Sequence, residues 1–424
     1  MKVIVFALNG CPTGWLGVYG NDWVGTPHLD RLASEAVTFD RHISDRPEPT
    51  AARRAWLGGT LPFGSRLREG TKTLLVRANH PDTDAPDWFY ACWGEVFDAR
   101  PQAEDASPLE HLLRAFPDIL DRLADASDFI LWIETDRLIP PWDVQQDVFE
   151  AYLEDELAPA PEEESAEPTK NGESGGDLEE AVDGEDEEPE PTTADPFPNE
   201  EPVTPFADPP TGPFDRADPD AWDWLHKTFA SVVTKLDAEL GGLFDYLREL
   251  GLDQSAAWLV TSDYGYPLGE HGQIGIHRPW LHEELVHLPL FLRLPGAEHA
   301  GRRVSGFTQP PDVFPTLLAL FGITPPSDAT GFNLLPLARG EAPSAREFAS
   351  TTLELGDAAE IAIRTHDSAL LVPTRVPEGD PPREPLLYEK PDDRCEVNNV
   401  RRGNIDRVDE LEAKLRAEVE KREE

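Results

Sequence analysis

Short apolar segments alternate along this chain with longer segments whose apolar residues recur every three or four positions. Four apolar runs predict buried β-strands: Val3–Leu8, Phe129–Ile133, Ala257–Val260 and Leu288–Leu292. Helical patterns lie between them, and strands that alternate with helices favour a mainly parallel sheet covered by helices on both faces. The pattern therefore predicts an α/β fold.

Two of the expected helices have recognisable ends. The clearer one carries apolar residues three or four positions apart from Leu225 to Leu250, and Gly251 follows as its C-terminal stop. The other is expected to begin at Thr26-Pro27, with the threonine as N-cap and the proline in the first turn.

The pattern changes beyond about Pro343, where short strands follow one another without long helices. The expected strands are Glu347–Leu355, Ile361–Arg364, Ala369–Val372 and Leu386–Tyr388. An amphipathic helix carrying Val408, Leu411, Leu415 and Val419 ends the chain. We therefore predict an α/β domain over residues 1–342 and a small α+β subdomain, with a sheet and a terminal helix, over residues 343–424.

An acidic insert interrupts the first domain at about residues 158–213. Residues 151–210 contain 21 Asp or Glu, 11 Pro and a single Lys. Such a composition buries too little apolar surface to offset the entropy lost on ordering, so we expect the insert to be disordered. An interaction tail is the alternative interpretation.

The net charge of −45 limits the possible partners. Asp and Glu number 82, against 37 Lys and Arg, of which only eight are Lys. So acidic a chain is a poor ligand for nucleic acid or an anionic membrane surface. An acidic chain poor in Lys is typical of a halophilic protein from a salt-rich cytoplasm, where salt screens the self-repulsion. The alternative is a merely acidic protein.

The remaining composition points to the cytoplasm. The three cysteines, Cys11, Cys92 and Cys395, are far apart and odd in number, so they suggest neither a disulfide framework nor a zinc site. The apolar run near the N-terminus lacks a small-residue cleavage site and is read as the first strand. No apolar run reaches the roughly 18 residues of a membrane span.

Polar residues follow three of the predicted strands, and these are the first candidates for a site. They are Asn9-Gly10, Glu134-Thr135-Asp136 and Thr261-Ser262-Asp263-Tyr264-Gly265. Ligands of open α/β sheets bind beyond the carboxyl ends of the strands. The alternative for the third group is that Thr-Ser-Asp only turns the chain and caps a helix.

Several motifs resemble the sulfatase family of the alkaline phosphatase superfamily. The segment T-S-D-Y-G at residues 261–265 is followed by L-G-E-H-G at 268–272, H-E-E at 282–284 and L-P-L at 288–290. Near the start, W-L-G-V-Y-G at 15–20 precedes T-P-H-L-D-R-L-A at 26–33. The resemblance covers nearly the whole chain apart from the acidic insert, and it implies the family's α/β fold.

The resemblance also implies a mechanism. In the family a cysteine matured to formylglycine supplies the nucleophile, a calcium ion neutralises the sulfate, and Lys and His residues assist. Here the nucleophile position falls on Pro49, the histidine of the middle motif on Ile139, and one metal position on Tyr264. The paired aspartates fall on Asn9 and Gly10, the catalytic lysine falls on Arg278, and Asp263 alone is unchanged. We therefore expect a divergent member that holds no calcium, with Asp263 and Asn9 as a vestigial metal site.

Two groups of residues remain candidates at this site. Thr50 lies one position after the lost cysteine and is a possible nucleophile, although no activating base is evident. Arg53, Arg54, His277 and Arg278 are candidates for binding an anion. Alternatively, Arg53 pairs with Asp263 as a structural ion pair.

The sequence thus favours a sulfatase-like protein that is catalytically inactive and binds a small anionic ligand or a protein partner. One alternative is an active sulfuric or phosphoric ester hydrolase with an atypical nucleophile and metal site. Another is a structural subunit that pairs with an active relative. In each case we expect Asn9, Thr50, Asp263 and Arg278 to converge in one pocket, while the oligomeric state is left open.

Overall fold

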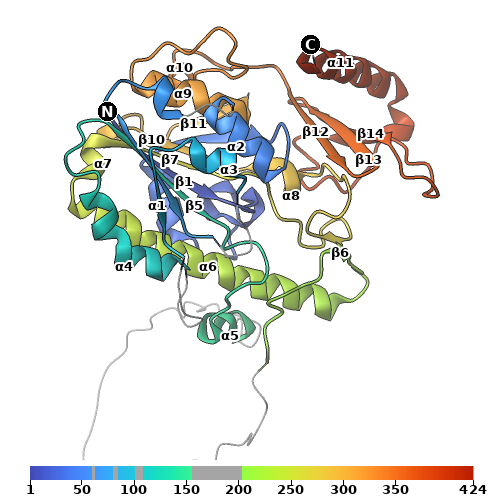
Figure 1. Cartoon of the computed structure of the whole chain (residues 1–424). Helices are drawn as coiled ribbons and strands as arrows, with labels where there is room; N and C mark the ends of the chain where they lie inside the picture. The colour runs from blue at the N-terminus through green and yellow to red at the C-terminus, as the bar shows by residue number, and fades with distance from the viewer. Residues whose placement is uncertain (60–62, 80–84, 101–107, 155–202, 424) are drawn as a thin grey trace, which may run out of the picture.

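The computed structural model describes residues 1–59, 63–79, 85–100, 108–154 and 203–423. Its main sheet has the strand order β11-β2-β10-β7-β1-β5-β3-β4, and β9 pairs with β2 (Figure 1). In chain order the strands are β1 (Lys2–Leu8), β2 (Val37–Ile43), β3 (Lys72–Arg77), β4 (Glu95–Asp98), β5 (Phe129–Thr135), β7 (Ala256–Thr261), β9 (His287–Leu288), β10 (Leu290–Arg293) and β11 (Arg303–Thr308).

The sheet is mixed and mostly parallel. Strand β1 pairs in parallel with both β5 and β7, whereas β10 runs antiparallel to β7 and β2. The run expected as one strand over Leu288–Leu292 is divided between β9 and β10 at Pro289, which has no N–H to give to a ladder. The α/β class predicted from the sequence is confirmed.

Alternate residues of β1 point to opposite faces of the sheet and enter two separate cores. Ile4 and Phe6 pack with α1 (Pro27–Ser34), α4 (Pro108–Asp121) and α6 (Pro219–Glu249). Val3 and Val5 pack with the opposite helices, which are α2 (Pro49–Leu57), α3 (Asp87–Ala91), α9 (Val313–Leu320) and α10 (Leu335–Arg339). Figure 1 shows these two helical layers on either side of the sheet. The short helices α5 (Gln146–Glu154), α7 (Leu252–Ser255) and α8 (Glu283–Val286) complete the domain.

The helix expected from Leu225 to Leu250 is α6, and Gly251 follows it with φ +66°. The helix expected at Thr26-Pro27 is α1, but Thr26 does not cap it with its side chain. Instead the Asp237 carboxylate on α6 accepts hydrogen bonds from the backbone N–H groups of His28 (2.9 Å) and Leu29 (2.8 Å). The cap therefore comes from a residue about 200 positions away, which a local pattern cannot reveal.

The C-terminal residues form the expected small sheet and helix. Four antiparallel strands follow one another as β12 (Ala349–Leu355), β13 (Ala358–Arg364), β14 (Ser368–Arg375) and β15 (Leu386–Glu389). Helix α11 (Ile405–Glu423) covers one face through Val408, Leu411 and Leu415. Residues of the other face, including Ala362 and Leu371, belong to the core of the main domain. Figure 1 shows this subdomain beside the main sheet.

The expected acidic insert lies mostly outside the described residues, but its last part does not. The Phe206 N–H donates to Thr228 Oγ1 (3.0 Å), and the Trp142 N–H donates to the Ala207 carbonyl (2.7 Å). Strand β6 (Gly212–Pro213) then pairs with β8 (Gln273–Ile274). Residues 203–213 are thus part of the fold, although their proline-rich composition led us to place them in the insert.

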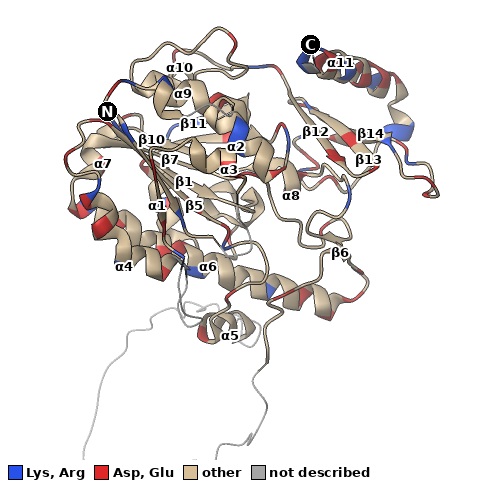
Figure 2. Cartoon of the chain, in the orientation of Figure 1, with Lys and Arg blue, Asp and Glu red and all other residues tan. Residues whose placement is uncertain are grey.

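Acidic residues lie along the outer helices α4, α6 and α11, with basic residues among them on α6 and α11 (Figure 2). Within the described residues, no helix has both the length and the apolar character needed to cross a membrane.

Candidate functional site

The carboxyl ends of β7, β1 and β5 meet at one edge of the sheet. Asn9, Glu134 and Asp263 lie at these ends, and all three are buried. Asp263 Oδ1 accepts hydrogen bonds from the backbone N–H groups of Gly10 (3.0 Å) and Tyr264 (2.9 Å). A bridge between Gly10 and Gly265 fixes the two turns relative to each other. The polar residues that follow these three strands therefore form one buried cluster at the edge of the sheet.

Arg53 enters this cluster from α2 and pairs with Glu134. Its Nε lies 2.9 Å from Glu134 Oε1, and both side chains are buried. Burial opposes the Arg53 charge, but the Glu134 carboxylate, together with Asp263 and Tyr90, outweighs burial, so the pKa of Arg53 is raised. The sequence left open whether Arg53 pairs with Asp263 or faces a ligand. Its direct partner is Glu134, one of the strand-end candidates, and not Asp263.

Asp263 forms no direct salt bridge with any of the described residues. Burial raises the pKa of its carboxyl to about 7, although the nearby Arg53 guanidinium lowers that pKa. Among the described residues, no hydrogen-bond partner is found for Asp263 Oδ2 or for the buried Asn9 Oδ1. A carboxyl with this pKa is at least half protonated below neutral pH, so it behaves as a neutral buried group rather than as a fixed anion.

The family's calcium does not fit the residues present here. Calcium binds 6–8 oxygens, most of them from carboxylates and carbonyls. Asp263 and Asn9 offer one carboxyl that is easily protonated and one amide oxygen, while Glu134 is bonded to Arg53. Within the described residues, no three His, Cys, Asp or Glu side chains are grouped as metal ligands would be.

A cavity of about 460 Å³ opens beside this cluster, and we call it the strand-end cavity. Pro49, Ile139 and Tyr264 all line it. These are the three positions at which the family resemblance implies the nucleophile, the histidine and a metal ligand. Its further walls come from two places, the 208–211 segment that precedes β6 and strand β12 with Leu353 and Leu355. The structure thus brings together three replaced positions that are far apart in the sequence.

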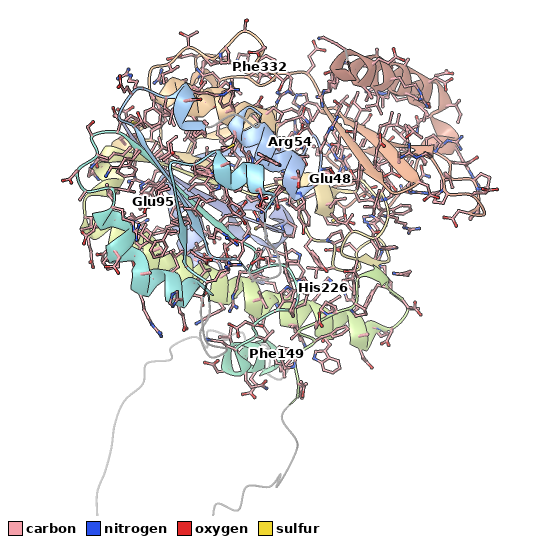
Figure 3. All side chains as sticks on the ribbon, in the orientation of Figure 1. Glu48, Arg54, Glu95, Phe149, His226 and Phe332 are labelled. Atoms are coloured by element: carbon pink, nitrogen blue, oxygen red, sulfur yellow. The ribbon has the colours of Figure 1, made fainter. Side chains whose placement is uncertain are left out.

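Thr50 and Arg54 face a different cavity. A helix turns about 100° per residue, so Thr50 points away from the direction of Pro49, and Arg54 lies one turn after Thr50 on the same side. Both line a cavity of about 410 Å³, together with Arg46 and Arg66. Figure 3 labels Arg54 on α2 and Glu48 at the N-terminal end of this helix.

His277 and Arg278 lie beside the C-terminal subdomain. The Arg278 guanidinium stacks over Trp280 at 4.2 Å, and that of Arg383 stacks over the same ring at 4.3 Å. Burial, and then the Arg383 charge, lower the pKa of Arg278. Burial and the Arg278 charge likewise lower the pKa of His277. Neither residue lines the strand-end cavity.

The structure therefore groups some of the predicted site residues and separates others. Asn9, Asp263 and Arg53 belong to one buried cluster, Thr50 and Arg54 share a neighbouring cavity, and His277 and Arg278 stack near the small sheet. Their convergence in a single pocket remains a prediction. His271 forms hydrogen bonds with Glu284 (2.7 Å) and with the Glu396 carbonyl (3.1 Å), which tie its loop to the C-terminal subdomain.

Comparison with known proteins agrees with this architecture. The family model described as "Sulfatase" matches residues 194–323. N-acetylglucosamine-6-O-sulfatase from Bacteroides thetaiotaomicron is 33% identical over 115 residues, which are 27% of this chain and 20% of that protein. Human arylsulfatase K is 33% identical over 110 residues, covering 26% of this chain and 20% of that protein. The matched segment thus spans about a fifth of the length of these relatives.

Solved structures show the same fold over almost the whole chain. The phosphonate monoester hydrolase of Agrobacterium radiobacter superposes with a TM-score of 0.64 at 17% identity, covering 97% of this chain and 95% of that one. A structure described as a 2-O GAG sulfatase also has a TM-score of 0.64, at 16% identity, covering 99% and 91%. The fold of this chain is therefore the one seen in these hydrolase and sulfatase structures. In sequence, the chain resembles the sulfatase family over residues 194–323.

Proposed function

We propose that this protein does not hydrolyse sulfate esters by the family's route and acts instead as a binding protein. The observation that carries the proposal is the lining of the strand-end cavity by Pro49, Ile139 and Tyr264. Proline offers no nucleophile, and isoleucine cannot transfer a proton. Burial, followed by the Asp263 charge, raises the pKa of Tyr264 well above its ordinary value, so its phenol stays protonated.

The strand-end cavity suits an apolar or cationic group better than a sulfate. Among its lining residues, Glu48 and Asp208 carry charge, and both are acidic. Burial raises the pKa of Glu48, as expected for a carboxyl in apolar surroundings. The four basic residues expected to bind an anion lie outside this lining. We therefore propose that the cavity takes an apolar portion of a small ligand or of a protein partner. The net charge of −45 supports action in a salt-rich cytoplasm.

One observation favours the alternative of an ester hydrolase with an atypical nucleophile. Thr50 shares its cavity with Arg46, Arg54 and Arg66, and arginines are suited to binding the oxygens of a sulfate or phosphate ester. The Thr50 hydroxyl would still need an activating base. This alternative therefore predicts that any activity depends on Thr50 rather than on Asp263.

The test is turnover of aryl sulfate, aryl phosphate and phosphonate monoesters by the full chain, at high salt and with Ca²⁺, Mg²⁺, Mn²⁺ or Zn²⁺ added in turn. We expect no turnover above that of the Asp263→Asn and Thr50→Ala variants. Saturable turnover that Thr50→Ala abolishes would establish the alternative. Turnover that Asp263→Asn abolishes while Thr50→Ala retains it would show that the strand-end site is catalytic and refute the proposal.

A further inference from the structure

A second cavity, of about 250 Å³, lies between the edge of the main sheet and the small C-terminal sheet, and we call it the basic cavity. Its walls come from β2, β11 and the turn after β13. The strand-end cavity touches Leu353 and Leu355 at one end of the β12–β13 hairpin, whereas the basic cavity touches Thr365 and His366 beyond the other end. The two cavities are therefore separate sites.

The basic cavity has the opposite charge from the protein as a whole. Five Arg or Lys side chains and two His line it, against the two acidic residues Asp40 and Glu283. The basic residues are Arg41, Arg303, Arg364, Lys390 and Arg394. In a chain with 82 acidic and 37 basic residues, this is an unusual concentration of positive charge. Such a lining favours an anion.

The two acidic residues of the basic cavity are already paired. Arg303 Nε donates to Asp40 Oδ1 at 2.8 Å. Glu283 lies 2.8 Å from His287 Nδ1 and 3.1 Å from Lys390 Nζ. These two carboxylates therefore leave some of the cationic groups of the cavity uncompensated.

Arg41 and Arg394 are the uncompensated cations of the basic cavity. Within the described residues, neither forms an ion pair with a carboxylate. The Arg41 guanidinium stacks over Phe307 at 5.4 Å, donates to the Ser305 carbonyl (3.2 Å) and contacts His366 Nδ1. Burial, and then the Arg41 charge, lower the pKa of His366, so the histidine is a neutral acceptor that helps to orient this cation.

Arg364 supplies a buried donor at the same place. Its Nη2 donates to Glu396 Oε1 (2.8 Å) and to the Leu281 carbonyl (2.8 Å). In the part of the chain that the structure describes, its buried Nη1 has no hydrogen-bond partner. A buried N–H without a partner is uncommon and is satisfied by an acceptor from a ligand or water.

We propose that the basic cavity binds a small organic ester of a tetrahedral oxyanion, either a phosphate or a sulfate. The oxyanion contacts Arg41, Arg364 and Arg394, because arginine guanidinium groups match the oxygens of such anions. Tyr19, Ile43 and Phe307 provide apolar walls for the organic group. The site does not use the strand-end cluster, so it stands whether or not the protein hydrolyses esters.

The experiment is titration calorimetry of the full chain with phenyl phosphate, phenyl sulfate and phenol at constant ionic strength. We expect at least one of the two esters to bind and phenol not to bind. Arg41→Gln and Arg394→Gln should each weaken the binding roughly tenfold, as expected when one charge-assisted hydrogen bond is lost. Arg402→Gln is the matched control, since it removes the same charge from an exposed position outside the cavity.

The outcomes separate the two sources of the oxyanion. Tighter binding of phenyl phosphate identifies a phosphate ester as the ligand class, and tighter binding of phenyl sulfate identifies a sulfate ester. The proposal is overturned if neither ester binds, or if Arg402→Gln weakens binding as much as the two cavity variants. Circular dichroism of the variants shows whether the fold persists, and Arg41→Lys, which retains the charge, should lose less affinity than Arg41→Gln.

Discussion

Replacing Asp263 by asparagine should stabilise this protein at alkaline pH. Asp263 is buried, and its pKa is raised from the ordinary value of 3.8 to about 7. Between these two pH values the unfolded chain releases the proton while the folded chain keeps it. Stability is therefore lost as the pH rises through this window, and the loss is complete above about pH 7.

The magnitude follows from the difference between the two pKa values. The difference, 7 minus 3.8, is about 3 pH units, which corresponds to about 4 kcal/mol of unfolding free energy. At pH 5 only about 1–2 kcal/mol of this penalty has developed. Asparagine is isosteric, and its oxygen can still accept from Gly10 and Tyr264. Asp263→Asn should therefore gain about 1–2 kcal/mol at pH 5 and about 4 kcal/mol at pH 8.

The assay is equilibrium denaturation of wild type and variant between pH 5 and pH 8, above the isoelectric point of about 4.4. Burial also raises the pKa values of Glu270 and Glu360 to about 7, so these groups contribute to the pH dependence of the wild type. The difference in unfolding free energy between wild type and variant therefore reports the contribution of Asp263. Asp312→Asn is the contrasting control. The Asp312 carboxylate forms two 2.6 Å bonds with Arg346, and its loss should destabilise the protein at both pH values.

A calcium site would give the opposite result. Bound calcium would keep Asp263 ionised, and its removal would then cost stability at pH 8. Millimolar calcium would also raise the melting temperature of the wild type but not that of the variant. If Asp263→Asn is destabilising at pH 8 and this calcium response appears, the assignment of a neutral, metal-free cluster is wrong.

Three further predictions concern the rest of the chain. Deleting residues 158–202 should leave the melting temperature nearly unchanged. Extending the deletion to residue 213 should lower the melting temperature clearly, because Phe206 and β6 contact the main domain, and thermal melts of the two shortened chains test this. Leu411→Ala should cost about 2–5 kcal/mol in denaturant unfolding, since this leucine is buried between α11 and the small sheet. Raising potassium chloride from 0.1 M to 2 M should increase the melting temperature clearly, and an unchanged value would contradict the halophilic interpretation.

The sequence predicted best those elements whose residues are buried on both sides. Strands β1, β5 and β7 are continuous apolar runs because helices cover both faces of the sheet there, and α6 shows a clear helical period. Strand β2 was missed because polar residues, above all the charged Asp40 and Arg41, outnumber its apolar residues. Asp40 and Arg41 also line the basic cavity. The charged residues that interrupt the strand pattern therefore belong to the proposed anion site.

The sequence predicted where the site lies but not which side chains pair within it. Strand ends and motif positions brought Asn9 and Asp263 to one edge of the sheet, as the sequence indicated. The partner of Arg53 could not be derived, because Glu134 lies 81 residues away and competes with Asp263 at a similar place. The orientation of Thr50 could not be derived either. One residue along α2 decides which of the two cavities a side chain faces.

The strand-end cluster shows how buried carboxyl groups can be compensated by groups of the chain itself. Carboxyl groups buried at the strand ends require such compensation. Here the Arg53 guanidinium compensates Glu134 directly, while a proton compensates Asp263 up to about pH 7. Neither arrangement disturbs the parallel pairing of β1 with β5 and β7. The cavity beside this cluster is lined by Pro49, Ile139 and Tyr264, and our proposal is that it serves as a binding surface.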